Sequence, residues 1–332
     1  FLEGYRPACV LGLNRGGLPR PAEKALGRED VPQALHFLED PDWYDPDPEH
    51  WALFKRVYVF DPTHGKRLAS FGLDNRRFLP FGALLSAPQF IPPWMGNRRY
   101  AITFVGSSGY NRESGRYFEQ IERLRPGIRA QCEPLIEGCL QDGATWLREQ
   151  LFKDDRFTDL GSQGLLLKMI EEEATLRSHR AFLTAVADQP LTLFGDAGWG
   201  ISRHAESLTK NYAGRALPYP SETAAVYARS DININLFHLQ CERSLNARVY
   251  DVMACGGFLL CQYSPAVEDM FRIGEHLETF SSPAELLEKV RYYLSHPNER
   301  REIARRGQAE VLAHHTIRHR LETILRDFGV IG

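Results

Sequence analysis

The sequence lacks any long apolar run, any excess of positive charge and any paired cysteine motif, and each absence excludes a class of protein. No run approaches the ~20 apolar residues that span a bilayer. The net charge is −3, so no global positive field favours nucleic acid or an anionic membrane. The six cysteines lack C-x-x-C spacing and mostly lie in apolar contexts. They indicate reduced, buried thiols of a cytoplasmic protein, and neither disulfides nor a zinc site.

The beginning of the chain lacks both a methionine and a leader. FLEGYRP has no charged segment followed by an apolar one, so we expect no signal peptide. The missing methionine suggests that residues precede Phe1 in the full protein.

The 332 residues are enough for about two domains. Strands alternate with helices through the second half, which predicts a parallel sheet covered by helices. The proline-rich segment 87–98 is the expected domain boundary. Helices are expected at 113–125, at about 143–153 and at about 163–187, and the acidic run 171–173 is interpreted as an exposed helix face. Four short strands are expected in the first hundred residues, in ACVLGLN, QALHFLED, RVYVFD and RRFLPFG.

The segment ERSLNARVYDVMACGG, residues 242–257, is expected to be a helix between the strands DININLF and GGFLLCQY. Ligands of open α/β sheets bind where such helices begin, because free N–H groups and the helix dipole favour an anion there. Arg243 and Arg248 would reinforce that preference. Asp251, on the same stripe as Ser244 and Arg248, could accept bonds from sugar hydroxyls. The pattern suits a nucleoside diphosphate with its ribose; the alternative is an amphipathic helix with a solvated polar face.

Two further turns place glycine just after a strand. FVGSSG contains Gly106 and Ser107, and FGDAGWG contains Gly195, Asp196 and Trp199. Glycine there lets backbone N–H groups approach a phosphate or a sugar, although ordinary strand-to-helix turns also use glycine. Neither turn has the G-x-G-x-x-G or the G-x-x-x-x-G-K-[ST] pattern.

Catalytic candidates lie at strand ends in the first domain. In HFLEDP, Glu39 and Asp40 are adjacent carboxylates, one of which could act as a general base because repulsion and partial burial raise a carboxyl pKa. The alternative is an aspartate that caps the loop before Pro41. His64 of FDPTH could touch a phosphate or act as a base, or it could stabilise a turn.

Two patterns that imitate metal sites are interpreted as structural. DPD at 45–47 lies in a proline-rich loop without strand context. HHTIRHR places His315 and His319 one helical turn apart, but no acidic third ligand is nearby, so a solvated helix face is expected. We expect no bound metal.

The assembled segments resemble glycosyltransferases of the GT-B architecture, and specifically the CgeB-like group. The resemblance is almost continuous from about 190 to 328 and more general in the first hundred residues. The segments that carry it are GDAGW, YARSDININL, SLNARVYDVMACGGFLL, and SPAELLEKVRYYLSHPNERREIARRGQAEVLAHHT. SLNARVYDVMACGG closely follows the pattern S-x-N-x-R-x-x-E-x-x-A-C-G-G.

The resemblance implies two Rossmann-like α/β domains facing a cleft, with a nucleotide-sugar donor held by the C-terminal one. Ser244, Asn246 and Arg248 would hold the diphosphate. Asp251 would bind ribose or sugar hydroxyls, although the group usually has glutamate there. Asp40 matches an acidic position of the N-terminal domain and would serve as base or acceptor contact. Such enzymes need no metal, because helix N-termini and arginine neutralise the leaving diphosphate.

The expected function is therefore transfer of a sugar (hexosyltransferase type) from a nucleotide-diphosphate donor to a glycan, protein or small-molecule acceptor. The alternatives are a nucleotide-sugar epimerase of the same architecture and a non-catalytic sugar-nucleotide-binding module. The expected divisions are an N-terminal domain at 1–92 that is abbreviated, a C-terminal domain at 93–312 with a helical insertion near 112–187, and a helix at 313–332 that crosses back to the N-terminal domain.

Overall fold

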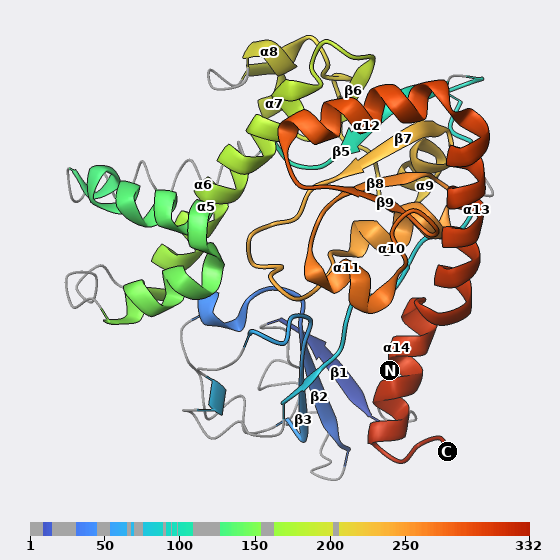
Figure 1. The fold of residues 1–332 in the computed structure, drawn as a ribbon. Helices are drawn as coiled ribbons and strands as arrows, with labels where there is room; N and C mark the ends of the chain where they lie inside the picture. The colour runs from blue at the N-terminus through green and yellow to red at the C-terminus, as the bar shows by residue number, and fades with distance from the viewer. Residues whose placement is uncertain are drawn as a thin grey trace.

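The structure is a computed structural model of the 332-residue chain. It describes residues 9–14, 31–44, 54–64, 68–69, 76–88, 91–93, 95–97, 99–108, 127–153, 163–201 and 206–332. Two separate parallel sheets organise these residues, one N-terminal and one C-terminal, and the last helix of the chain returns to the N-terminal sheet (Figure 1).

The N-terminal sheet buries alternate residues on opposite faces. Leu35 and Val57 lie in one apolar cluster, whereas Ala34 and Tyr58 pack with Ile324 of α14 (Ile317–Asp327) on the other face. This period of two follows from the alternating side-chain directions of a strand. The strands are parallel and in chain order: β1 (Val10–Leu13), β2 (Gln33–Phe37), β3 (Arg56–Val59) and β4 (Arg76–Phe78). All four expected strands are confirmed.

The C-terminal sheet is also parallel, as the alternation of strands and helices predicts. The first strand of this sheet in the chain is β5 (Tyr100–Val105). The second, β6 (Leu191–Phe194), pairs on one side of β5, and the third, β7 (Ser230–Asn235), pairs on the other side. The gap between β5 and β7 is therefore the point where the strand order reverses. The spatial order is β6 (Leu191–Phe194), β5 (Tyr100–Val105), β7 (Ser230–Asn235), β8 (Leu259–Gln262) and β9 (Glu278–Phe280).

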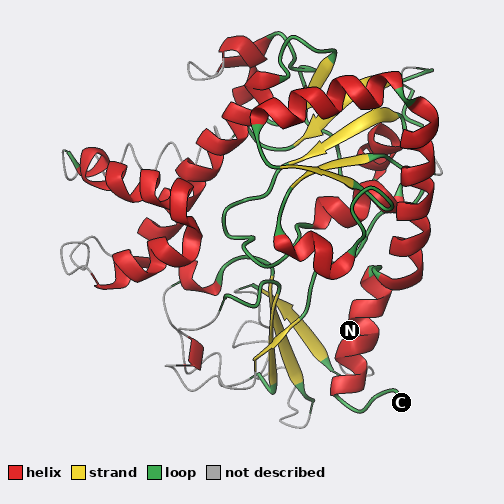
Figure 2. Cartoon of the chain, in the orientation of Figure 1, coloured by secondary structure: helices red, strands yellow, loops and turns green. Residues whose placement is uncertain are grey.

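Helices cover both faces of this sheet (Figure 2). Ile232 and Ile234 of β7 pack in one core with α6 (Gln163–Ala185) and α12 (Pro283–Ser295), whereas Leu259 and Cys261 of β8 pack with α10 (Ala247–Ala254). Ser282 caps α12, because its hydroxyl accepts from the Glu285 N–H at 3.2 Å. The remaining helices of this half are α7 (Gly198–Ile201), α8 (Glu206–Thr209), α9 (Ser221–Ala228), α11 (Pro265–Met270) and α13 (Pro297–His314).

A pair of long helices, α5 (Ile128–Lys153) and α6, packs its own apolar cluster against the N-terminal domain. Trp43 of the short helix η1 (Pro41–Trp43) joins this cluster. The expected helix at 143–153 is only the second half of α5, whose two halves meet at Gly143 with a φ of 85°. The helix expected at 113–125 lies outside the described residues.

Helix α10 is shorter than expected. The prediction of a helix from residue 242 is wrong, because residues 242–246 form a loop and the helix begins at Ala247 after an extended Asn246. The helix ends at Ala254, just before the Gly256–Gly257 pair, which is consistent with glycine as a helix terminator. Gly256 has a φ of 77°, and Gly257 N–H bonds to the Val252 carbonyl at 3.0 Å, as in the usual glycine-terminated helix end.

Two further expectations can be compared with the structure. All six cysteines are free thiols, and five of them are buried, as predicted. His315 and His319 do not share one helix, because α13 ends at His314 and α14 begins at Ile317. In the described part of the chain, no helix combines the length and apolar character needed to cross a bilayer.

Candidate functional site

A pocket of about 270 Å³ opens at the carboxyl ends of β5 and β7. Open α/β sheets bind their ligands at this reversal of strand order. The first turn of α10 and one side of α6 complete the wall. The lining residues are Phe104, Gly106, Ser107, Glu172, Thr175, Leu176, His179, Leu236, His238, Asn246 and Arg248. Four residues that the sequence predicts to contact the nucleotide-sugar donor line this pocket: Gly106, Ser107, Asn246 and Arg248.

Arg248 supplies positive charge to this pocket. Its guanidinium donates to the buried Asn235 Oδ1 at 3.0 Å and lies 5.4 Å from the centre of the Phe104 ring. A Cβ at Gly106 would lie 2.8 Å from Phe104 and 3.2 Å from Arg248 Nη2. Glycine is thus required at position 106 because both side chains occupy the space where a methyl group would lie.

Asn246, directly before α10, contributes an unused acceptor. Its Nδ2 donates to the Leu236 carbonyl at 3.2 Å, whereas its buried Oδ1 has no hydrogen-bond partner among the described residues. Buried polar atoms are normally satisfied, so this oxygen suits a ligand that donates a hydrogen bond. The side chain does not cap the helix. The N-terminal end of α10, with its favourable dipole for anions, therefore faces the pocket without a capping side chain.

Two neutral histidines add to the wall. The Gln240 N–H donates to His238 Nδ1 at 3.2 Å, which leaves the ring proton on Nε2. Burial lowers the pKa of His238 to about 3. His179 Nε2 donates to the Phe237 carbonyl at 3.0 Å, and burial lowers its pKa to about 4. Both rings are neutral at pH 7, so they contribute hydrogen bonding and shape but no charge.

Asp196 and Trp199 hold the two glycine turns together. The Asp196 carboxylate accepts from the Ser108 N–H and from the hydroxyls of Ser107 and Ser108 at 2.5–2.9 Å. Burial opposes ionisation of Asp196, but these hydrogen bonds outweigh it and lower its pKa. Trp199 Nε1 donates to the Gly106 carbonyl at 3.0 Å. Asp196 and Trp199 therefore position the turn that lines the pocket and do not line it themselves.

Gly195 permits the closest approach of these turns. A Cβ on Gly195 would overlap the carbonyl oxygen of Gly106. Gly195 was predicted to contact a ligand through its backbone. In the structure it packs against the Gly106 turn and does not line the pocket.

Asp251, predicted to bind ribose or sugar hydroxyls, does not line the pocket, and both of its carboxylate oxygens accept hydrogen bonds from protein groups. Its Oδ1 accepts from the backbone N–H groups of Leu84 and Leu85 at 2.9 and 3.0 Å, and its Oδ2 accepts from the Tyr219 hydroxyl at 3.0 Å. The residue is buried, and burial raises its pKa. Asp251 thus ties the segment that enters the C-terminal domain to α10.

Arg243 and Ser244 also lie outside the pocket, because the helix begins after them. Arg243 is exposed, and its backbone N–H donates to Asp61 Oδ2 at 2.8 Å. Ser244 is completely buried. The predicted role of Arg243 relied on a helix that started at residue 242, whereas the predicted role of Ser244 also came from the family resemblance and stays a prediction.

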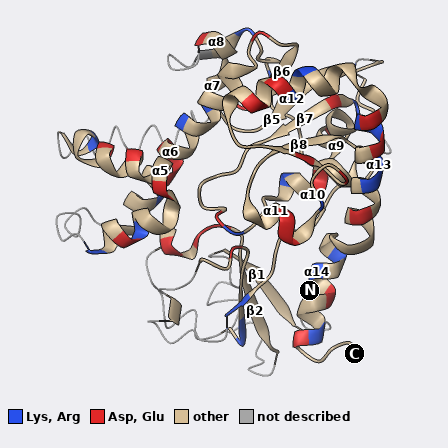
Figure 3. Ribbon diagram, in the orientation of Figure 1, with Lys and Arg blue, Asp and Glu red and all other residues tan. Residues whose placement is uncertain are grey.

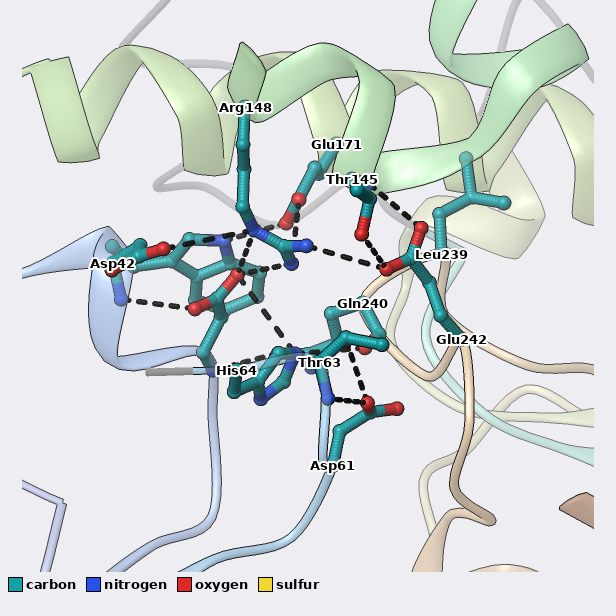
Figure 4. Close-up of polar contacts among 12 residues, drawn as sticks. Asp42, Asp61, Thr63, His64, Thr145, Arg148, Glu171, Leu239, Gln240 and Glu242 are labelled. Atoms are coloured by element: carbon teal, nitrogen blue, oxygen red, sulfur yellow. Dashed lines mark hydrogen bonds and ion pairs between the residues drawn. The ribbon is translucent and has the colours of Figure 1, made fainter. Parts of the chain in front are cut away.

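Asp40 and His64 lie close together in a buried polar cluster, with His64 Nε2 3.9 Å from Asp40 Oδ2. Figure 4 shows His64 and other members of this cluster. Both residues are buried. Arg148 of α5 donates to Asp40 from Nε at 2.9 Å and from Nη2, and the Asp42 N–H donates to Asp40 at 2.9 Å. Burial disfavours the charged form of Asp40, but the Arg148 guanidinium and the hydrogen bond from the Asp42 N–H outweigh it and lower the pKa of Asp40.

His64 has a fixed neutral tautomer in this cluster. Its Nε2 donates to the Gln240 carbonyl at 2.9 Å, and burial lowers its pKa. A carboxylate with a lowered pKa that is paired with arginine is a weak base, and neither side chain reaches solvent. The geometry therefore argues against the predicted general-base roles of Asp40 and His64.

The sequence did not reveal three members of this cluster: Arg148, Glu171 and Glu242. Arg148 lies 3.4 Å from carboxylate oxygens of both Glu171 and Glu242, and Trp43 Nε1 donates to Glu171 at 2.6 Å. Glu171 is completely buried and Glu172 and Glu173 are partly buried, so the interpretation of residues 171–173 as an exposed helix face is wrong. Burial raises the pKa of Glu171 well above its usual range.

No metal site emerges in the described ranges, where no group of three His, Cys, Asp or Glu side chains is arranged to hold an ion. The DPD segment at 45–47 lies outside these ranges.

Comparisons with known proteins give a partial family match and similar folds. Residues 177–326 match the family model described as "Glycosyl transferase-like". This match includes Arg248 and the rest of α10. A search of curated protein sequences found no match.

Solved structures share the fold at low sequence identity. HepE from Anabaena in complex with UDP-glucose is 10% identical, with a TM-score of 0.50 over 93% of this chain and 75% of that chain. The same protein in complex with UDP and glucose is 9% identical, with a TM-score of 0.50 over 91% and 72%. TarM is 10% identical with a TM-score of 0.49; the match covers 93% of this chain but 52% of TarM, so this chain spans about half the length of TarM. The chain therefore has the GT-B fold of two Rossmann-like domains, and its C-terminal part is similar to glycosyl transferase-like domains.

Proposed function

We propose that the protein transfers a sugar from a nucleoside-diphosphate donor to an acceptor hydroxyl in the cytoplasm, as a CgeB-like glycosyltransferase of the hexosyltransferase type. The observation that carries this proposal is Arg248, which lies in the first turn of α10 and lines the pocket where the strand order reverses. A guanidinium and a helix N-terminus together suit a diphosphate. HepE, which shares the fold, is described in complex with UDP and with UDP-glucose, so uracil is the first base to test.

The pocket residues divide into anion-binding and hydroxyl-binding groups. Arg248, the first turn of α10 and the backbone of Gly106 and Ser107 would bind the diphosphate. Asn246 Oδ1 would accept a hydrogen bond from a ligand hydroxyl, and His238 Nε2 would donate one. Asp196 and Trp199 would act indirectly, by fixing the turn at Gly106.

The chemistry follows from these positions. The bond between the sugar carbon and the diphosphate oxygen breaks, its electron pair stays on the departing diphosphate, and the acceptor oxygen bonds to the sugar carbon. Arg248 and the dipole of α10 would stabilise the charge that develops on the diphosphate, so we propose that no metal is required. Glu172 is the carboxylate that lines the pocket, and we assign it the acceptor proton.

The proposed domain division keeps the boundaries expected from the sequence. The N-terminal domain comprises 1–92, the C-terminal domain 93–312, and residues 313–332 cross back. The contact of Ile324 with Ala34 and Tyr58 supports the crossing.

Calorimetric titration with UDP, GDP, CDP and dTDP, without metal and then with magnesium, tests the proposal. One clear binder whose affinity does not depend on magnesium is expected. Incubation with the matching nucleotide sugar then distinguishes the alternatives: slow donor hydrolysis or transfer supports the transferase, interconversion of sugars supports an epimerase, and neither supports a binding module. No binding to any nucleotide by folded protein contradicts the donor site.

A further inference from the structure

A second cavity lies at the opposite end of the C-terminal sheet. Its volume is about 370 Å³, and its walls are the residues before β5 and β8, the start of β7 and one side of α13. Arg99 precedes β5 and lines this cavity, whereas Gly106 follows β5 and lines the donor pocket. A strand of six residues separates the two sites, which is about 20 Å at 3.3 Å per residue.

Arginines dominate this cavity. Four of them line it against one carboxylate: Arg99, Arg300, Arg301 and Arg305 against Asp231. Figure 3 shows the basic positions that recur along α13. A concave wall that collects charge of one sign concentrates the electric field and attracts ions of the other sign.

The internal ion pairs leave most of this charge uncompensated. Asp231 Oδ1 is shared by Arg300 at 2.9 Å and Arg99 at 3.5 Å. Arg305 pairs with Glu302 at 2.8 Å, but Glu302 also pairs with Arg306 and does not line the cavity. One aspartate therefore faces several guanidinium groups.

Arg300 is the fixed part of the site. Its side chain is only 7% exposed, and it donates to the Tyr293 carbonyl and to Asp231. Arg99 is 64% exposed, and Arg301 is also exposed, so both can turn toward a ligand. Phe258 and Ala304 give the cavity an apolar wall beside these charges.

We propose that this cavity binds a small phosphorylated molecule, with its phosphate held by Arg99 and Arg301 in front of Arg300. Two guanidinium groups can hold the oxygens of one phosphate by charge-assisted, bidentate hydrogen bonds. The volume exceeds that of a bare phosphate, and Phe258 and Ala304 offer contact to a carbon skeleton. A phosphomonoester of about the size of a hexose phosphate therefore fits the site. The site is separate from the donor pocket and does not depend on the proposed transferase activity.

The test is calorimetric titration of inorganic phosphate and of a hexose 6-phosphate into the full chain, at constant ionic strength. Wild type is compared with the double variant Arg99→Gln/Arg301→Gln. The matched control is Arg272→Gln/Arg318→Gln, which removes two arginines that are 74% and 85% exposed and lie outside the cavity. We expect the cavity variant to lose at least about 10-fold in affinity and the control to stay within about 2-fold.

Three results would overturn the proposal. The first is no binding of either probe to wild type up to about 10 mM. The second is an equal loss in both double variants, which would indicate a general charge effect. The third is displacement of the phosphate probe by UDP, which would place the anion in the donor pocket. Binding of wild type to anionic lipid vesicles without binding of either probe would favour a membrane surface instead. Unchanged circular dichroism of both variants verifies that they fold.

Discussion

Arg148 lies in the buried polar cluster and Arg248 lines the donor pocket, and the surroundings of the two arginines differ. Arg148 of α5 is 9% exposed and contacts carboxylate oxygens of Asp40, Asp42, Glu171 and Glu242 within 4 Å. Arg248 of α10 bonds to the neutral amide of Asn235 and forms no salt bridge with any residue that the structure describes. Arg148 is paired with carboxylates within the fold, whereas Arg248 lines the pocket and contacts the neutral side chain of Asn235.

The cluster around Arg148 joins three parts of the chain. Asp40 comes from the N-terminal sheet, Arg148 and Glu171 from the helical pair, and Glu242 from the loop before α10. The Thr145 hydroxyl and N–H donate to Glu242 at 2.5 and 2.7 Å, which adds a second link between α5 and that loop. We infer that this cluster sets the position of the N-terminal domain against the wall of the donor pocket.

The largest effect is expected for Arg148→Met. Removal of the cation leaves several buried carboxyl groups without compensation, which typically destabilises a protein by about 3–5 kcal/mol. Urea unfolding monitored by circular dichroism measures the change. The control is Arg177→Met, because Arg177 also faces three glutamates, Glu133, Glu137 and Glu173, but its side chain is more exposed. The control should cost less than about 1 kcal/mol. Equal costs would contradict the structural role assigned to Arg148.

Arg248→Ala should lower the affinity for the nucleotide with little loss of stability, whereas Arg148→Met mainly lowers stability. If Arg248 pairs with a diphosphate, the affinity for the preferred nucleotide should fall by about 1.5–3 kcal/mol. Calorimetry measures the affinity, and urea unfolding verifies the fold. Arg243→Ala is the matched control, because that side chain lies outside the pocket and only its backbone contacts Asp61. An unchanged affinity in folded Arg248→Ala would remove Arg248 from the donor site.

The sequence predicts features that depend on local patterns, and it does not predict those that depend on contacts between distant residues. The strands were found because alternation and short apolar runs are local signals, and Ile232 and Ile234 carry theirs within four residues. Gly106, Ser107, Asn246 and Arg248 line one pocket because parallel strands bring their carboxyl ends, and the starts of the helices that follow, to one edge of the sheet. The beginning of α10 was misplaced because the loop before it is held by distant partners such as Asp61, which no local pattern reveals.

The cluster around Arg148 could not be predicted for a related reason. Arg148 and Asp40 are 108 residues apart, and a charged residue on a helix normally faces water. Glu171 differs from Glu172 and Glu173 only in the direction in which it leaves α6, so the acidic run gives no indication that its first member is buried. Asp251 shows the limit of a motif: its position matches the group's pattern, but its carboxylate is occupied by Leu84, Leu85 and Tyr219.

Glu171→Gln should change stability only slightly at pH 7, by less than about 1 kcal/mol, because burial raises the pKa of Glu171 and favours the uncharged form that glutamine imitates. A raised carboxyl pKa gives stability that is complete at low pH and is lost as the pH rises above about 4.5 toward the folded-state value. The wild type should therefore lose stability over this range, and the variant should lose less. Urea unfolding at a series of pH values measures the difference. Identical pH profiles would show that folding does not change the pKa of Glu171, which would contradict the raised pKa.

Asp251→Asn should have the smallest effect on ligand binding and sharpens the contrast with Arg248. Asparagine keeps an oxygen for the N–H groups of Leu84 and Leu85, and its amide can donate to the Tyr219 oxygen, so the link survives in weakened form. We expect a loss of about 0.5–1.5 kcal/mol in stability. The affinity for the nucleoside diphosphate should stay within about 2-fold, because Asp251 does not line the pocket. Calorimetry and urea unfolding on the same sample separate the two effects. A loss of affinity as large as that of Arg248→Ala, without a comparable loss of stability, would return Asp251 to the ribose contact that the sequence motif suggests.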